Sequence, residues 1–268
     1  LTGGWYVVKG TVSRAQINVT GTEARPANLI LADGAKLTAR DSSDYHPGIK
    51  VASGAALNIY AQSVDADTMG QISASGGYGG AGIGGAGEKG TCGTLNIYGG
   101  KVTATGGEYA AGIGGGGHND KTGGKGGTIS IYGGVVTAKG DNGGAAIGGG
   151  SRASGGTISI FGGEVHAENG DNSEGAGIGG GYNCDGGTIL IAGGKVTAIG
   201  GSKDGGGAGI GGGEYGAGGV VTITGGDVSA KGRKNSAGIG GGREGAGGTI
   251  TISNGVVRAT GGEYAAGI

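Results

Sequence analysis

Short stretches in which apolar and polar residues alternate recur along the chain, and glycines bound each of them. Alternation with a period of two is typical of a β-strand that buries one face. In the unit that begins at residue 128, the pattern predicts five inward-facing residues, Ile129, Ile131, Val136, Ala138 and Ile147. It predicts five outward-facing residues in the same unit, Thr128, Ser130, Tyr132, Thr137 and Lys139.

Three motifs repeat in a constant order. An Ala/Gly-Ile-Gly motif recurs every 29 to 34 residues, with its isoleucine at Ile83, Ile113, Ile147, Ile178, Ile210, Ile239 and Ile268. A strand-like motif that ends in isoleucine precedes a glycine pair, and a second strand-like motif such as Lys101–Ala104 follows that pair. Each unit of about 30 residues therefore holds three short strands.

One such coil cannot bury its apolar face alone, whereas coils stacked about 4.8 Å apart close a continuous core. We therefore predict an all-β fold, a right-handed parallel β-helix (solenoid) with three short strands per coil and nine or ten coils. Residues 1–55 are assigned to an N-terminal cap and irregular first coils, with Trp5 as a plug over the open end. Residues 56–268 are assigned to regular glycine-rich coils that stop within a repeat.

Composition excludes several other classes of protein. The chain has 79 glycines but only 2 prolines and no Gly-X-Y period, which argues against collagen. Glycine costs about 1 kcal/mol per helical position relative to alanine, which argues against helices. The net charge is −1 without a basic stripe, so nucleic acid is not an expected partner. No apolar run approaches the roughly 20 residues of a membrane span, so we expect no membrane insertion.

The segments Gly3–Val8, Leu29–Gly34 and Leu57–Tyr60, followed by Ala-Gly-Ile-Gly-Gly units, resemble a known family over essentially the whole chain. That family is the glycine-rich β-helix region of large cell-surface proteins of Gram-positive, often gut-dwelling, bacteria. The resemblance implies a secreted or cell-wall-attached, adhesin-like module that binds complex carbohydrate. It supplies no catalytic residue.

Aromatic residues end the first strand of four successive coils, and we expect them to face outward as a ladder. Sugars bind through aromatic faces and nearby polar groups, so this column is the candidate glycan site. Stacking of like side chains on neighbouring strands is the structural alternative. The four residues are Tyr60, Tyr98, Tyr132 and Phe161.

Two patterns suggest metal ions weakly. Glu164, His166 and Glu168 alternate on one strand and offer three zinc-ligand types, although nothing obvious supplies a fourth ligand. A column of carboxylates, broken by Arg233 and Lys234, leaves structural calcium possible as the only cofactor. Its members are Glu108, Asp141, Asp171, Glu174, Asp204 and Glu263.

The two cysteines, Cys92 and Cys184, fall three coils apart, about 14 Å by stacking alone. A disulfide needs Cα atoms within about 7 Å, so we predict that this pair is not bridged.

The outward positions lack a dense cluster of Asp, Arg and His, so a polysaccharide-degrading enzyme is not expected. A column of outward threonines suggests alternatives, namely a structural stalk, a filament subunit that self-associates through its ends or flat faces, or an ice-binding surface. These threonines are Thr94, Thr128, Thr157, Thr188 and Thr249. The preferred hypothesis is a non-catalytic extracellular surface module whose partner is a polysaccharide or a cell-surface glycan.

Overall fold

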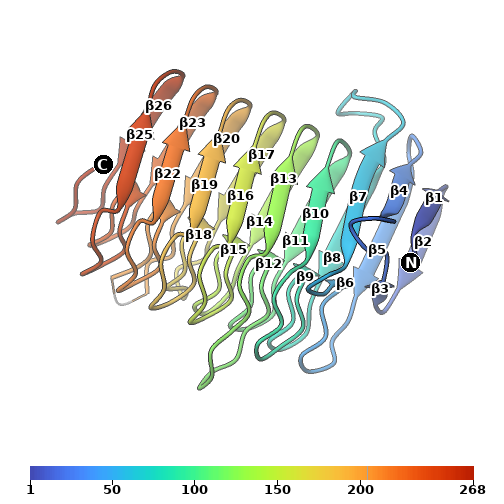
Figure 1. Cartoon of the computed structure of the whole chain (residues 1–268), viewed down its shortest axis with the longest axis horizontal. Coiled ribbons are helices and arrows are strands. Elements are labelled where there is room, and N and C mark those ends of the chain that lie inside the picture. The colour runs from blue at the N-terminus through green and yellow to red at the C-terminus, as the bar shows by residue number, and fades with distance from the viewer. Residues whose placement is uncertain (204) are drawn as a thin grey trace.

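The computed structural model describes residues 1–203 and 205–268, and it is a solenoid of stacked coils (Figure 1). Every strand pairs in parallel with the equivalent strand of the next coil, which produces three long sheets that we call A, B and C. Sheet A contains β1 (Gly4–Val8), β4 (Ala27–Leu31), β7 (Ala56–Ala61), β10 (Thr94–Ile97), β13 (Thr128–Ile131), β16 (Thr157–Ile160), β19 (Thr188–Ile191), β22 (Val220–Ile223) and β25 (Thr249–Ile252).

The other two sheets follow the same order along the chain. Sheet B contains β2 (Thr11–Arg14), β5 (Lys36–Arg40), β8 (Gln71–Ser75), β11 (Lys101–Thr105), β14 (Val135–Lys139), β17 (Glu164–Glu168), β20 (Lys195–Ile199), β23 (Asp227–Lys231) and β26 (Val256–Thr260). Sheet C contains β3 (Ile17–Val19), β6 (Ile49–Val51), β9 (Ile83–Gly84), β12 (Ile113–Gly114), β15 (Ile147–Gly148), β18 (Ile178–Gly179), β21 (Ile210–Gly211) and β24 (Ile239–Gly240).

The predicted fold class is confirmed, with three short strands in each coil. Sheets A and B have nine strands each and sheet C has eight, so the described residues form eight complete coils and part of a ninth. The prediction of nine or ten coils was therefore slightly too high. Residues 1–55 contribute β1 to β6, which belong to the same three sheets as the later coils.

The core is a set of columns in which like residues stack on like. Ile113 pairs with Ile147 in sheet C, and Ile129 pairs with Ile158 in sheet A. All five residues predicted to face inward in the unit from residue 128 are at most 1% exposed. This continuous core satisfies the apolar face that a single coil could not bury.

Trp5 does not plug the end of the solenoid, and that prediction was wrong. It lies on the outer face of β1, where it pairs in register with Asn28, and its side chain is 66% exposed. Alternation along β1 points Val8 inward instead, so Trp5 has to project away from the core. Its ring centroid lies 5.5 Å from that of Tyr60.

Glycine is required where coils approach most closely, as in sheet C. Gly148 has a φ of +141°, and a Cβ atom there would lie 1.9 Å from the carbonyl oxygen of Gly179 in the next coil. Real Cβ atoms do not come this close to backbone, so a side chain at this position would force the coils apart. The high glycine content is therefore a packing requirement of the stacked turns.

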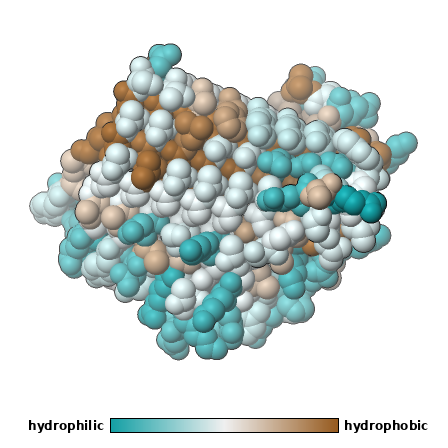
Figure 2. All heavy atoms as spheres, viewed as in Figure 1, coloured by the Kyte–Doolittle hydropathy of each residue, from teal (hydrophilic) through white to brown (hydrophobic). Residues whose placement is uncertain are grey.

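Surface hydrophobicity is uneven along the solenoid. Figure 2 shows hydrophobic surface gathered toward the C-terminal coils of the face in view and paler surface over the middle coils. Two exposed apolar residues on the last strands of sheet A are Val220 and Ile252. Among the described residues, no helix is long and apolar enough to cross a membrane.

Candidate functional site

The predicted aromatic ladder is present on the outer face of sheet A. Tyr60 lies on β7, and Tyr98, Tyr132 and Phe161 directly follow β10, β13 and β16. Successive ring centroids lie 4.7, 4.7 and 4.9 Å apart, and their planes differ by only 3°, 6° and 12°. In-register parallel strands fix this spacing, because Tyr98 N donates to Ile59 O and Tyr132 N donates to Ile97 O, both at 2.8 Å.

Stacking limits what the ladder offers to a ligand. Tyr98, Tyr132 and Phe161 are 40%, 43% and 42% exposed, but each inner ring is covered on both faces by its neighbours. Burial, and then the neighbouring hydroxyls of Tyr60 and Tyr132, raise the pKa of Tyr98. The ladder ends at Phe161, because Ala192 holds the next position and its N–H donates to Ile160 O.

A row of polar side chains flanks the aromatic ladder on the same face. Asn58 donates to Asn28, and Asn96 donates to Asn58, each at 2.8 Å. Ser130 and Ser159 continue this row by register. The combination places hydroxyl and amide groups two residues from the rings, on the same side of the sheet. Asn28 and Asn58 are only 8% exposed, so the half-buried Asn96, Ser130 and Ser159 are the members of the row that solvent reaches.

The predicted column of threonines also lies in register on sheet A. Thr94, Thr128, Thr157 and Thr188 pair successively, and Val220 interrupts the column before Thr249. A regular hydroxyl-bearing face therefore runs beside the polar row.

The three candidate zinc ligands form ion pairs and hydrogen bonds with protein side chains. Glu164 pairs with Lys195 at 2.7 Å, which lowers the pKa of the Glu164 carboxyl through a hydrogen bond and the opposite charge. His166 Nε2 lies 3.0 Å from one oxygen of Glu168, and Arg233 lies 3.1 Å from the other oxygen. Within residues 1–203 and 205–268, no group of three or more His, Cys, Asp or Glu side chains is arranged to hold a metal ion.

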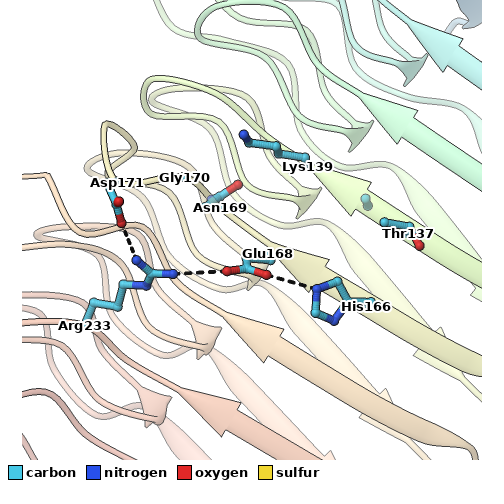
Figure 3. A pocket seen from close by; sticks show the side chains of 9 residues that line it. Thr137, Lys139, His166, Glu168, Asn169, Gly170, Asp171 and Arg233 are labelled. Carbon is cyan, nitrogen blue, oxygen red and sulfur yellow. Dashed lines mark hydrogen bonds and ion pairs between the residues drawn. The ribbon is translucent and has the colours of Figure 1, made fainter.

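His166 and Glu168 instead line a pocket of about 440 Å³ (Figure 3). Its walls come from β14, β17 and the loop after β23, so residues far apart in sequence meet there. Arg233 spans 62 residues of sequence to pair with Asp171 and also reaches Glu168. Hydrogen bonds fix the base of the pocket, because the buried Asn169 side chain donates to three carbonyl oxygens and accepts from the N–H of Gly140.

The carboxylates of the predicted column do not gather at one site, because several of them pair with other side chains. Glu108 accepts from Asn142 at 2.9 Å, and Glu174 pairs with Lys203 at 2.9 Å. Asp171 pairs with Arg233, the residue that we expected to break the column. Asp141 is exposed, and Asp204 lies outside the described residues.

A second aromatic cluster escaped the sequence analysis. Tyr78 makes edge-to-face contacts with Tyr45 and Tyr109 at centroid distances of 5.6 and 5.8 Å, and His118 stacks on Tyr45 at 5.7 Å. Burial raises the pKa of Tyr78 and of Tyr109. A signal was available, because each of these tyrosines precedes a sheet C isoleucine by four or five residues.

Burial also raises the pKa values of a carboxyl and of a thiol outside these clusters, Glu214 and Cys92. Glu214 is 1% exposed and pairs with Arg243 at 3.2 Å. Burial, followed by the charge of Glu174, raises the pKa of the Glu214 carboxyl. Cys92 and Cys184 are both free thiols, which confirms that they are not bridged, and burial raises the pKa of Cys92 to about 12.

These features define a three-sided parallel β-solenoid whose outward side chains form columns along its axis. A family model described as "Beta helix repeat" matches residues 95–117, 129–151, 158–182, 186–214, 221–243 and 250–268. The matches cover more than half of the chain, which therefore belongs to the β-helix repeat family. No curated protein and no solved structure gives a significant match to it.

Proposed function

We propose that this chain is a non-catalytic module of a bacterial cell-surface protein that binds complex carbohydrate. The observation that carries the proposal is the aromatic ladder, flanked by the row of amide and hydroxyl side chains on the same face of sheet A. Carbohydrate recognition uses apolar ring contacts together with hydrogen bonds to hydroxyl groups. Both kinds of group occur here at a spacing that repeats from coil to coil.

The resemblance to glycine-rich cell-surface proteins of Gram-positive bacteria supports the extracellular location. The segments that carry it include Gly3–Val8 and Leu57–Tyr60. The two thiols do not exclude such a location, because burial raises the pKa of Cys92 to about 12 and also raises the pKa of the half-buried Cys184, so both stay protonated.

A glycan array with the purified chain, run with and without calcium, is the primary test. The double variant Tyr98→Ala/Tyr132→Ala should lose about tenfold or more in affinity for any polymer that binds, which corresponds to about 1.4 kcal/mol for the two ring contacts together. The matched control is Thr157→Ala/Thr188→Ala on the same sheet, which should leave affinity unchanged. A folded chain that binds no glycan would overturn the proposal.

The stacking itself favours a second function, that of a structural stalk. Each inner ring buries both faces against its neighbours, so the ladder also stabilises the stack of coils without any ligand. In that case Tyr98→Ala/Tyr132→Ala should lower the melting temperature clearly, and the array should remain blank with the unaltered chain.

A further inference from the structure

A groove runs along the solenoid axis at the carboxyl edge of sheet B. Three cavities lie along this edge, of about 420, 410 and 440 Å³. Glu108 lines both the first and the second cavity. Asn172 of the second cavity directly follows Asp171 of the third in the sequence, and Asp141 of the second lies two residues after Lys139 of the third. The three cavities therefore occupy overlapping coils along the same edge of the solenoid.

The strand ends of sheet B form one wall of the groove. The last residues of β5, β8, β11 and β14, from Arg40 to Lys139, lie in register in successive coils. The track extends from Arg40 to Glu168 on β17, which is four coil steps or about 19 Å. A pyranose ring in a linear polysaccharide is about as long as one such step, so each coil can present its groups to one sugar unit.

The loops that follow sheet B form the opposite wall, and side chains tie them together between coils. Asn142 donates to Glu108 at 2.9 Å, and Lys203 donates to Asn142 at 3.1 Å. Ser202 donates to Asp171 at 3.3 Å. The wall is therefore ordered before a ligand arrives, which reduces the entropy cost of binding.

Arg233 closes the groove at its C-terminal end. Its guanidinium crosses the intervening coil to pair with Glu168 and Asp171, as Figure 3 shows. At the other end Tyr78, which belongs to the second aromatic cluster, lines the cavity beside Arg40.

Charge in the groove is nearly balanced. Its lining contains four cationic side chains, Arg40, Lys139, Lys203 and Arg233. It contains five carboxylates, Asp41, Glu108, Asp141, Glu168 and Asp171. A polyanion would meet as much repulsion as attraction, whereas a neutral polymer rich in hydroxyl groups finds donors and acceptors throughout.

We infer that this groove is a binding track for a linear, neutral polysaccharide of about four or five sugar units, ending at Arg233. The inference rests on the proposed carbohydrate-binding function and assigns it a site separate from the aromatic ladder. The ladder offers mainly ring edges, while the groove offers charged and hydroxyl side chains from several coils. The two sites lie on different sheets and can be tested independently.

The test measures affinity of the whole chain for a series of oligosaccharides taken from a neutral polymer that binds on the array. Thr137→Trp fills the groove, and it should weaken binding at least about tenfold. Lys139→Ala/Asp141→Ala removes two exposed polar groups and should weaken binding about tenfold. The matched controls are Ser229→Trp and Lys231→Ala, which occupy the equivalent register positions on β23, two coils after β17 and outside the cavity lining, and they should bind as the unaltered chain does.

Length dependence provides a second measurement, since affinity should rise up to about five sugar units and then level off. Normal binding by Thr137→Trp, with loss in Tyr98→Ala/Tyr132→Ala, would overturn the groove and leave the proposed function intact. No binding by the unaltered chain would overturn both. Stronger binding of a polyuronate than of the neutral polymer would contradict the assignment of ligand class.

Discussion

The close approach of successive turns makes a sharp prediction about one glycine. Gly186 precedes sheet A, and its φ is not in the left-handed region, so alanine there would be free of backbone strain. A Cβ atom would nevertheless lie 2.3 Å from the carbonyl oxygen of Gly218 and 2.8 Å from Cα of Gly211. All three of the nearest atoms are backbone, so no side chain can rotate away to make room.

The magnitude follows from what must move. An unstrained contact between a methyl group and a carbonyl oxygen needs about 1 Å more than the structure allows, and overpacking of this kind costs about 1–3 kcal/mol or more. Opening the turn also stretches the hydrogen bond from Gly186 N to Ala217 O, which is now 3.0 Å. We expect Gly186→Ala to lower the free energy of unfolding by about 3 kcal/mol, or the melting temperature by about 6–12 °C.

Gly170 is the matched control. A Cβ atom there would meet only the flexible end of Lys139, at 3.5 Å or more, and its φ is also outside the left-handed region. Gly170→Ala should be neutral, or stabilise the chain by up to about 1 kcal/mol by restricting the unfolded state. Thermal melts followed by far-UV circular dichroism compare the two variants, and hydrogen exchange shows whether the coils around Gly186 open locally. Equal melting temperatures for the two variants would refute the packing argument.

Two further predictions concern buried groups. Ile131→Ala should lower the free energy of unfolding by about 2–5 kcal/mol, because Ile131 is 0% exposed, while Ser130→Ala should have little effect in the same urea titration. Burial raises the pKa of the Cys92 thiol from its ordinary value of 9.0 to about 12 in the folded chain. The protonated thiol therefore favours the folded state fully below pH 9, and this contribution is lost as pH rises from 9 toward 12. The stability advantage of the unaltered chain over Cys92→Ala should therefore shrink by about 1.4 kcal/mol per pH unit above pH 9, and a pH-independent difference would contradict the burial of the thiol.

Period-two alternation was sufficient to predict the core and the aromatic ladder. Ile129 and Ile131 had to share a face, and equal placement in equal coils then stacks Tyr98 on Tyr132 without further information. The prediction that Trp5 plugs the end of the solenoid was wrong for a related reason. Alternation requires either Trp5 or Tyr6 to face outward, and only the pairing of β1 with β4 decides which one does.

The groove could not be predicted in the same way. The loops that build its outer wall differ in length from coil to coil, so motif spacing does not place Asn142 beside Glu108 or Lys203. Arg233 was expected to break a column of carboxylates, but its side chain reaches back across a whole coil to pair with Asp171. Contacts of this kind depend on long side chains and irregular turns, which leave no period in the sequence.

The glycines also restrict which surface positions of this fold can carry side chains that bind a ligand. The turns beside sheet C pack backbone against backbone, since a Cβ atom at Gly115 would lie 1.8 Å from the carbonyl oxygen of Gly124. No side chain can be introduced there without displacing the loop that covers it. Outward positions on sheets A and B, such as those of Phe161 and Thr137, face solvent or a cavity. Recognition can therefore change by substitution at these positions while the isoleucine columns and the glycine turns stay constant, which is why both proposed sites lie on sheets A and B.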